Sequence, residues 1–447
     1  MAEMIDLARL QKDAMRLVEA AQRAGADHCD VVVAHGQSVG MDVRDGKVEN
    51  SRRAEADTFS LRVFCSNQVA SVNTNTALEL DALAERAVAM ARVSPEDAYQ
   101  GLAPAEDLAA GFPDLDLCDA SVPEIDDLTK RALACEEAGL SVTGVSKSMG
   151  ASAGWGLSGF VLATSHGFRG SYSVSRHSMS CAMVAGEGTS MERDYDYHSA
   201  VHGDDLEDPT RLGRNAGERA VRRIDPRQVD SATVPVLFDK RVASGLVAAL
   251  AGAINGSSIA RKTSFLRNMM GKAVANPRIT LICDPLRQRG LASRPFDGEG
   301  MGHSAMRFVE KGILKDWVLD WATARELGLR SNGRATRSGS GTSPATTNLH
   351  LEPGTASLED MIASIDKGLY LTETIGHGIN MVTGDFSKGA SGFWIENGKI
   401  AWPVAGITIA GNLKDMFATM EPANDLEFRG ATNSPSLLVE AMTVGGK

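Results

Sequence analysis

One histidine lies close in the sequence to side chains that could act with it in catalysis. His377 is flanked by two glycines, and an aspartate and two serines follow shortly after it: Asp385, Ser387 and Ser391. In such a group a serine would be the nucleophile and the histidine its base. Closeness in sequence does not give a nucleophile its base geometry. His377 could instead contact a substrate. The simplest interpretation is that it is a turn residue exposed by its glycines, and that Asp385 accepts backbone N–H bonds that fix the segment.

The segment that carries these residues is rich in glycine. Five glycines fall between positions 376 and 392, too many for an ordinary strand connection. Glycine permits backbone paths that other residues cannot follow, or lets another chain approach closely. The pattern predicts a substrate loop that performs no bond chemistry, with the candidate residues Gly376, His377, Gly378, Thr383, Gly384, Asp385, Ser387, Gly389 and Ser391.

Two other histidines have a spacing that could hold a metal ion. His198 and His202 are four residues apart, which on a helix would place two imidazoles on one face. Gly203 interrupts any helix after a single turn, and no glutamate follows His198. Solvated loop histidines are the preferred interpretation, and a peptidase with its own metal or nucleophile stays open as the alternative.

A β-hairpin should fix the position of the glycine-rich segment. Asn397-Gly398 is the preferred type I′ turn, because both residues tolerate a positive φ. The expected cross-strand pairs are Glu396 with Lys399, Ile395 with Ile400, Trp394 with Ala401 and Phe393 with Trp402. The second and fourth of these pairs should line a single apolar face.

The N-terminal part of the chain is typical of an α+β fold. Apolar residues at helical spacing predict an amphipathic helix over 3–24, ended by Gly25. Antiparallel strands should follow, with an Asp45-Gly46 turn that pairs Val43 with Val48. The strand ranges are 29–35, 58–64 and 69–73.

Two capping boxes are expected to open further helices. Thr76 with Glu79 would begin a helix that ends near residue 90, and Ser121 with Glu124 one that ends near residue 139. Asp208 should cap a third helix, with Pro209 in its first turn.

The expected domain boundary lies at Asp225-Pro226, which ends that helix. Residues 1–227 form the predicted N-terminal α+β domain, with possible subdomains 1–100 and 120–227 joined by an acidic stretch. Residues 228–447 form the predicted C-terminal domain, which is expected to be mostly antiparallel β and barrel-like, with helices that include 240–254.

Charge and composition exclude several classes of function. A net charge of −11 argues against a nucleic-acid partner, whose phosphates require clustered lysine and arginine. The N-terminus is acidic where a signal peptide is basic, and no apolar run approaches the ~18 residues of a membrane span. We therefore expect a cytoplasmic protein without a membrane partner. The six cysteines lack Cys-x-x-Cys spacing and should be reduced and mostly buried.

Several long strings resemble the TldD/PmbA family, whose members are described as cytoplasmic peptidase subunits. The likeness covers TGDFSKGASGFWIENGKI and PVAGITIAGNLKDMF near the C-terminus and residues 43–64 near the start. SRHSMSC (175–181), RDYDY (193–197) and INGSSIARKTSFL (254–266) resemble the PmbA branch, also called TldE.

The TldD branch is known for a helix with a His-Glu-x-x-x-His motif that supplies two zinc ligands and a carboxylate for the metal-bound water. In an ungapped comparison from the strand that contains Phe238, the matching positions are Ala248, Ala249 and Ala253. No histidine lies between His202 and His303, so a shift of one or two residues changes nothing. The resemblance implies no cofactor in this chain and zinc in a partner subunit. If the helix descends from the zinc helix, the three alanines should face inward.

The resemblance implies the non-metal subunit of a heteromeric metallopeptidase. Its partner would be a TldD-like zinc-bearing homologue, and together they would cleave unfolded or extended peptides, such as antitoxins and leader segments of peptide antibiotics. This chain would shape the chamber and present backbone groups to the peptide. A non-enzymatic binding or regulatory homodimer stays open as a further alternative.

Overall fold

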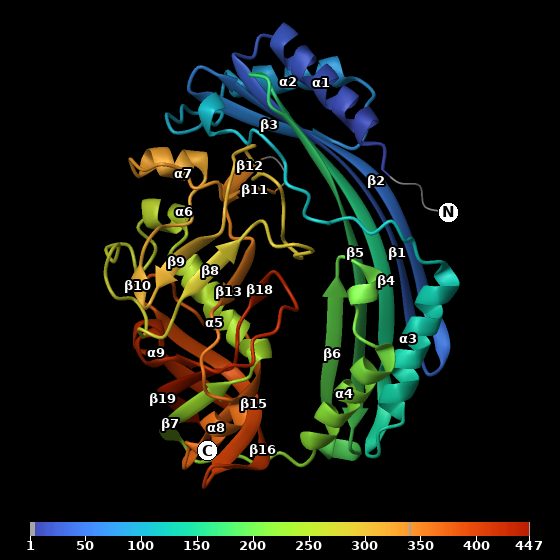
Figure 1. Cartoon of the computed structure of the whole chain (residues 1–447), viewed down its shortest axis with the longest axis vertical. Helices are drawn as coiled ribbons and strands as arrows, with labels where there is room; N and C mark the ends of the chain where they lie inside the picture. Colours follow the sequence, from blue (N-terminus) through green and yellow to red (C-terminus); the bar gives the residue numbers. More distant parts are fainter. Residues whose placement is uncertain (1–4, 339–340, 447) are drawn as a thin grey trace.

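The computed structural model describes residues 5–338 and 341–446. A six-stranded antiparallel sheet forms a long curved wall, and the C-terminal domain lies on its concave side (Figure 1). The strand order is β3-β2-β1-β4-β5-β6. The strands are β1 (His28–Arg44), β2 (Lys47–Cys65), β3 (Gln68–Thr74), β4 (Val145–Thr164), β5 (Arg169–Ala185) and β6 (Glu192–Ala200).

The β1–β2 hairpin turns at the predicted residues. Asp45 and Gly46 both have positive φ, and Val43 pairs with Val48. The strands run well beyond the predicted ranges, because β1 pairs with β4 along most of its length. The two halves of the N-terminal region therefore share one continuous sheet.

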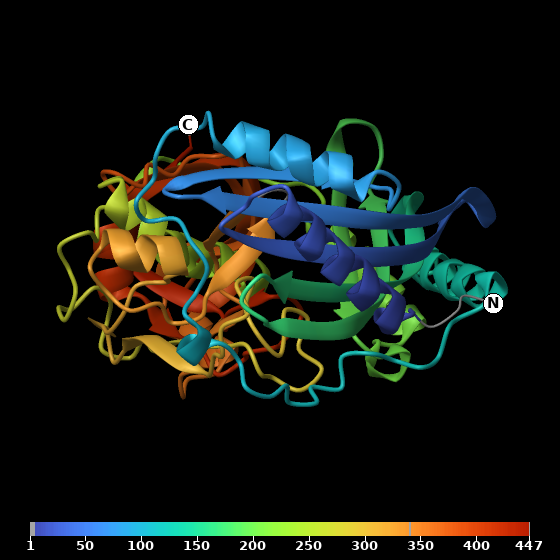
Figure 2. The same cartoon turned by 90° about the horizontal axis from the view of Figure 1, so that it is seen from above.

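Four helices cover one face of this sheet. They are α1 (Leu7–Arg23), α2 (Leu80–Ala91), α3 (Ile125–Leu140) and α4 (Pro209–Arg222). Odd-numbered residues of β1 point to this face, because side chains alternate along a strand. Val31 and Val33 pack under α1 and α2, whereas Met41 and Val43 pack under α3 and α4. Figure 2 shows α1 and α2 together over one end of the wall.

The helix starts were predicted with mixed success. Asp208 caps α4 as expected, accepting from the backbone N–H groups of Thr210 and Arg211. The capping boxes of α2 and α3 were wrong. Their N-cap residues are Glu79 and Glu124, and neither makes a side-chain cap bond. Glu79 has a φ of 65°, a left-handed conformation that prevents the reciprocal geometry of a capping box.

The opposite face of the wall is divided into two regions. At one end Val32 and Leu162 pack with Phe168 and with Phe296 of the C-terminal domain. Further along, β1 and β4 present only small residues that are not fully buried: Gly36, Ser38, Gly40, Ser152, Gly154, Gly156 and Ser158. The face that is turned toward the C-terminal domain thus becomes an open surface of glycine and serine.

The C-terminal domain contains a barrel. Strands β16, β15, β14, β7 and β19 pair in that order, and β16 also pairs with β19, which closes the ring. The mostly antiparallel, barrel-like prediction is confirmed; among the named strands of the described residues, β14–β7 and β13–β18 pair in parallel. The barrel strands are β7 (Ala232–Phe238), β14 (Lys367–Ile375), β15 (Asp385–Glu396), β16 (Lys399–Asn412) and β19 (Leu437–Gly445), with β17 (Glu421–Pro422) beside β19.

A five-stranded sheet and short helices complete this domain. The sheet has the order β10-β9-β8-β13-β18, and a separate hairpin pairs β11 with β12. These strands are β8 (Leu281–Asp284), β9 (Met306–Glu310), β10 (Ile313–Leu314), β11 (Ala335–Ser338), β12 (Gly341–Pro344), β13 (Asn348–Leu351) and β18 (Thr432–Asn433). The helices are α5 (Lys240–Ala253), α6 (Gly256–Ala260), α7 (Trp321–Glu326), α8 (Leu358–Ala363) and α9 (Leu413–Thr419). The N-terminal region contains 3-10 turns at Ala105–Asp107, Gly188–Ser190 and Gly203–Asp205.

The β15–β16 hairpin turns at Asn397-Gly398, as predicted, but its register is only partly the predicted one. Glu396 pairs with Lys399 and Ile395 with Ile400, after which a bulge shifts the register. Trp394 therefore pairs with Trp402, and Phe393 with Pro403. The predicted apolar face is found in part: Phe393, Ile395 and Ile400 pack in one cluster, but Trp402 packs against the main core. Trp394 belongs to the main core, whereas Phe393 and Ile395 pack on the other side with α8, so both faces are buried.

A buried ion pair joins the two parts of the molecule. Asp30 of β1 is 1% exposed and contacts Arg62 of β2 at 2.5 Å and Arg337 of β11 at 2.7 Å. Burial alone would raise the pKa of Asp30, but the two arginines hold it below its usual range. All six cysteines are free and five are buried. None of the described helices is long and apolar enough to cross a membrane.

Candidate functional site

The glycine-rich segment consists of a loop followed by a paired strand. β14 ends at Ile375, the loop runs over 376–384, and β15 begins at Asp385. Gly376, His377, Gly378, Thr383 and Gly384 are loop residues. The expectation of one continuous loop was wrong for the rest. Asp385, Ser387, Gly389 and Ser391 pair with β16 or β14 because β15 lies between those two strands.

The loop is held by side chains and by one close backbone approach. The Asp385 carboxylate accepts from the Thr383 hydroxyl at 2.6 Å and from the Asn412 amide at 3.1 Å. These two hydrogen bonds hold the pKa of Asp385 below its usual range. We had expected backbone N–H groups to donate to Asp385, but in the described residues its donors are these two side chains. Ser387 N–H donates to the Gly378 carbonyl at 2.6 Å, which brings the loop against β15.

His377 is exposed and is the second residue of this loop, close to the end of β14. No hydrogen bond or ion pair within residues 5–338 and 341–446 joins His377 to Asp385, Ser387 or Ser391. Ser391 is 7% exposed and lies in the barrel wall. The arrangement therefore offers a contact surface and does not pair a nucleophile with a base.

The loop packs beside helix α5. Phe265 N–H, shortly after α5 and α6, donates to the Met381 carbonyl at 2.9 Å. A Cβ placed on Gly252 of α5 would lie 3.4 Å from the Met381 methyl group. The predicted substrate loop and the helix that resembles the zinc helix are thus neighbours, although more than a hundred residues separate them in the sequence.

The three alanines of α5 do not share one orientation. Ala249 is 7% exposed and Ala253 is fully buried, but Ala248 is exposed. The inward-facing prediction is wrong for Ala248, because positions five apart on a helix lie about 140° apart around its axis. Among the described residues no group of three or more histidine, cysteine, aspartate or glutamate side chains could hold a metal ion.

His198 and His202 contact different parts of the chain. His198 Nδ1 accepts from the Glu207 N–H, and His202 Nε2 lies 3.1 Å from an Asp116 carboxylate oxygen. Strand β6 ends at Ala200 between them, so the helical spacing that would join them does not exist.

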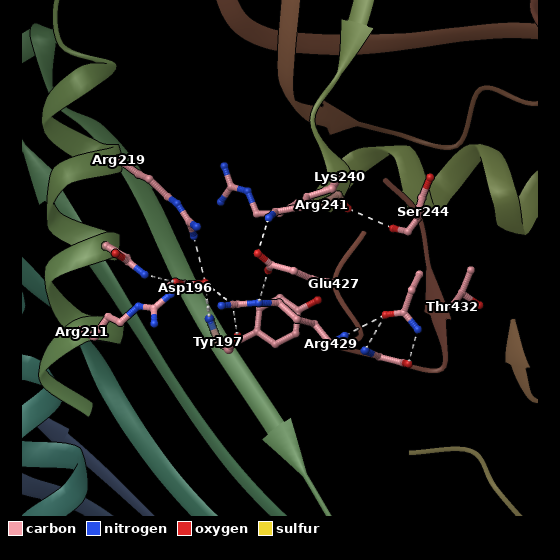
Figure 3. Close-up of a pocket in the computed structure, with 14 residues that line it drawn as sticks. Asp196, Tyr197, Arg211, Arg219, Lys240, Arg241, Ser244, Glu427, Arg429 and Thr432 are labelled. Carbon is pink, nitrogen blue, oxygen red and sulfur yellow. Dashed lines mark hydrogen bonds and ion pairs between the residues drawn. The ribbon is translucent and has the colours of Figure 1, made fainter. Parts of the chain in front are cut away.

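A charged pocket lies at the N-terminal end of α5 (Figure 3). Its volume is about 140 Å³, and it is formed where β6 and α4 meet α5 and the segment 427–434. Five of its lining residues are cationic and two are anionic. The cations are Arg211, Arg219, Lys240, Arg241 and Arg429, and the anions are Asp196 and Glu427.

This cluster covers the free edge of β6. Tyr195 and Tyr197 point their backbone groups away from β5, where a further strand could pair. The Tyr195 carbonyl accepts from Arg219 and Arg241, and the Tyr197 carbonyl from Arg429. Their N–H groups donate to Asp194 and Asp196. The edge is therefore closed to strand addition at these residues.

The buried charges of the cluster are fully paired. Asp194 is 3% exposed, and burial alone would raise its pKa, but Arg241 at 3.0 Å holds that pKa below its usual range. Burial would lower the pKa of Arg429, yet Asp196 and Glu207 outweigh it and raise the pKa. The guanidinium group of Arg429 therefore stays charged at any physiological pH.

Sequence reasoning did not identify this pocket. The string RDYDY did carry a signal, because alternation along a strand places both aspartates on one face and both tyrosines on the other. The partners of those aspartates come from α4, α5 and the segment near residue 429, and no local pattern connects them.

Three segments of the chain match known domain families. Residues 29–91 match PmbA/TldA metallopeptidase domain 1, residues 118–224 the central domain, and residues 231–446 the C-terminal domain of the same metallopeptidases.

Whole-chain relatives agree with these matches. A metalloprotease PmbA homolog from Haemophilus influenzae is 35% identical over 96% of this chain and 94% of its own length. A crystal structure from Bacteroides thetaiotaomicron, described as a proposed modulator of DNA gyrase, has a TM-score of 0.90 at 28% identity and covers both chains fully. TldE from Thermococcus kodakarensis has the same fold, with a TM-score of 0.86 at 20% identity over 97% of this chain and 100% of its own.

Proposed function

Because the chain belongs to the PmbA/TldD metallopeptidase family, we propose that it is the non-metal subunit of a heteromeric peptidase of this family. A TldD-like homologue would hold the zinc ion and cut the peptide. This chain would bind the peptide and form part of the chamber. The substrates would be unfolded or extended peptides, including antitoxins and leader segments of peptide antibiotics.

The observation that carries this proposal is the composition of α5. Ala248, Ala249 and Ala253 stand on a well-formed helix of fourteen residues, at the positions that the family resemblance assigns to zinc ligands and their carboxylate. A methyl group can neither bind a metal ion nor accept a proton from a bound water. This composition supports a subunit that keeps the fold of the metallopeptidase and leaves the zinc chemistry to its partner.

Two surfaces support a role in substrate binding. The glycine and serine face of β1 and β4 is turned toward the C-terminal domain, and small polar side chains there leave room for another chain. The loop 376–384 lies against α5 and is fixed by the barrel strands β14 and β15 beside it. A binding loop positioned by a rigid scaffold is a common arrangement of a binding site.

Reconstitution tests the proposal. The chain and a zinc-bearing homologue from the same organism are purified separately, and cleavage of an unfolded reporter peptide is measured for each and for the mixture. We expect no cleavage by either protein alone and cleavage by the mixture. Full activity of the homologue without this chain would remove the proposed role, and zinc-dependent activity of this chain alone would favour an autonomous peptidase.

A further inference from the structure

The charged pocket beside α5 has more hydrogen-bond donors than acceptors on its wall. Its carboxylates are already occupied. One oxygen of Asp196 accepts from Tyr197 N–H and contacts Arg219 and Arg429, and the other accepts from Asn215. The two oxygens of Glu427 accept from Lys240 and Arg429.

These contacts occupy only some of the N–H donors of the arginines. A guanidinium carries five N–H donors in a planar fork. In the described part of the chain, Arg211 makes its ion pair through Nε, to Glu207 at 2.9 Å, and Arg219 uses only its NH1 group. Figure 3 shows both side chains extending from α4 toward the space above Tyr197, opposite Lys240 and Arg241 of α5. The wall therefore has donors left over, and its lining residues carry more positive than negative charge, while Asp194, Asp239 and Glu207 pair with its arginines from behind.

The N-terminal end of α5 contributes three side chains to this wall. Lys240, Arg241 and Ser244 belong to the first turns of that helix, and they line the pocket. The Asp239 carboxylate already caps this helix end by accepting from the Arg241 N–H at 2.9 Å, so the positive charge offered to a ligand comes from the side chains. Because the backbone edge of β6 is covered, a peptide cannot pair with this strand as a further strand. A ligand would be recognised by a charged group that enters the pocket.

We propose that this pocket binds a carboxylate group of an extended peptide. A volume of about 140 Å³ corresponds to roughly four or five water molecules, at ~30 Å³ each, which suits a carboxylate with its adjoining methylene groups. Paired guanidinium donors match the two oxygens of a carboxylate. The proposal rests on the proposed peptide-binding function. It adds a preference for peptides that place an acidic side chain or a free C-terminal carboxylate near α5.

Binding to the isolated chain tests this preference without any catalysis. Three acetylated pentapeptides serve as probes in calorimetric titrations at low salt, where screening is weak. One has a central glutamate and a C-terminal amide, the second a central glutamine and an amide, and the third a central glutamine and a free C-terminal carboxylate. We expect at least one carboxylate peptide to bind at least about tenfold more tightly than the neutral peptide. Which one does so identifies the source of the carboxylate.

A matched pair of variants locates the effect. Arg211 and Arg214 are both exposed residues of α4, but only Arg211 lines the pocket. The Arg211 side chain is 71% exposed, and Glu207 keeps a second partner in Arg429, so Arg211→Glu should fold normally. We expect Arg211→Glu to reduce the carboxylate preference below about threefold and Arg214→Glu to retain it.

Two results would overturn the proposal: equal affinity for all three peptides, or a preference that Arg211→Glu retains. The outcome is independent of the reconstitution assay. A carboxylate preference in the isolated chain with no cleavage by the mixture would remove the proposed function alone, and cleavage without the preference would remove only the carboxylate site.

Discussion

Gly378 should not tolerate even a methyl group. An ideal Cβ at this position would lie 1.4 Å from the Ser387 carbonyl oxygen, which belongs to the rigid strand β15. Real Cβ atoms essentially never approach a backbone oxygen more closely than 3.0 Å, so Gly378→Ala must move the loop away from the strand. The movement breaks the bond from Ser387 N–H to the Gly378 carbonyl and the neighbouring bond from Asn380 N–H to the Asp385 carbonyl.

Two lost hydrogen bonds set the size of the effect. At about 1 kcal/mol each, they lower the free energy of unfolding by about 2 kcal/mol. For a domain of ~150–250 residues this corresponds to a fall in Tm of about 4–8 °C. Gly389 is the matched control on the same hairpin. A Cβ there would meet Ile375 at 3.5 Å, an ordinary contact, so Gly389→Ala should change stability by less than about 0.5 kcal/mol.

Calorimetry and amide hydrogen exchange would measure both variants. Gly378→Ala should show the lower Tm and faster exchange at the amides of Asn380 and Ser387, while exchange in α5 stays unchanged. The reasoning is refuted if Gly378→Ala melts with the native protein and keeps its loop amides protected. It is equally refuted if Gly389→Ala lowers the free energy of unfolding as much as Gly378→Ala does.

Three further perturbations have expected outcomes. Asp30→Ala should lower the free energy of unfolding by about 3–5 kcal/mol in urea titrations, because it leaves two buried arginines without a counterion; a loss below 1 kcal/mol would contradict this. Burial and the neighbouring Asp297 raise the pKa of Glu299 to about 8, so its contribution to stability is complete below its unfolded pKa of about 4.5 and is lost as the pH rises toward 8. Glu299→Gln should therefore raise Tm at pH 8.5 more than at pH 5.5, and a uniform change would contradict the assignment. Ala253→His should destabilise the fully buried site by about 1–3 kcal/mol, whereas Ala248→His on the exposed side of α5 should stay within about 0.5 kcal/mol; equal losses would show that the two faces are not distinct.

Local signals predicted local structure. The Asp208-Pro209 helix start and the Asn397-Gly398 turn are both found, because each depends on backbone preferences of adjacent residues. The bulge next to Trp394 has no such signal. It arises because β15 must pair with β14 on one side and with β16 on the other, and the curvature of the barrel shifts the register.

The candidate site shows the same limit at longer range. The glycine spacing indicated that the backbone is closely approached in this segment, as the Ser387 carbonyl approaches Gly378. The same spacing also predicted a loop over residues 385–392, which instead belong to β15 and pair with β14 and β16. The inward orientation of Ala248 failed because neighbouring alanines give no amphipathic pattern from which to assign a buried face. The charged pocket was not predicted at all, since Asp196 and Arg429 meet only when the two domains pack together.

The division of labour between the subunits can be tested directly in the reconstituted complex. The zinc-binding histidines of the TldD-like partner are replaced by alanine, and the altered partner is mixed with the native chain under conditions where co-purification proves that the complex has formed. Cleavage of the unfolded reporter peptide is then measured at saturating zinc. Our account predicts complete loss of cleavage, with full recovery when the native partner is restored. Residual zinc-dependent cleavage by the altered complex would contradict it, because the remaining activity would have to come from this chain.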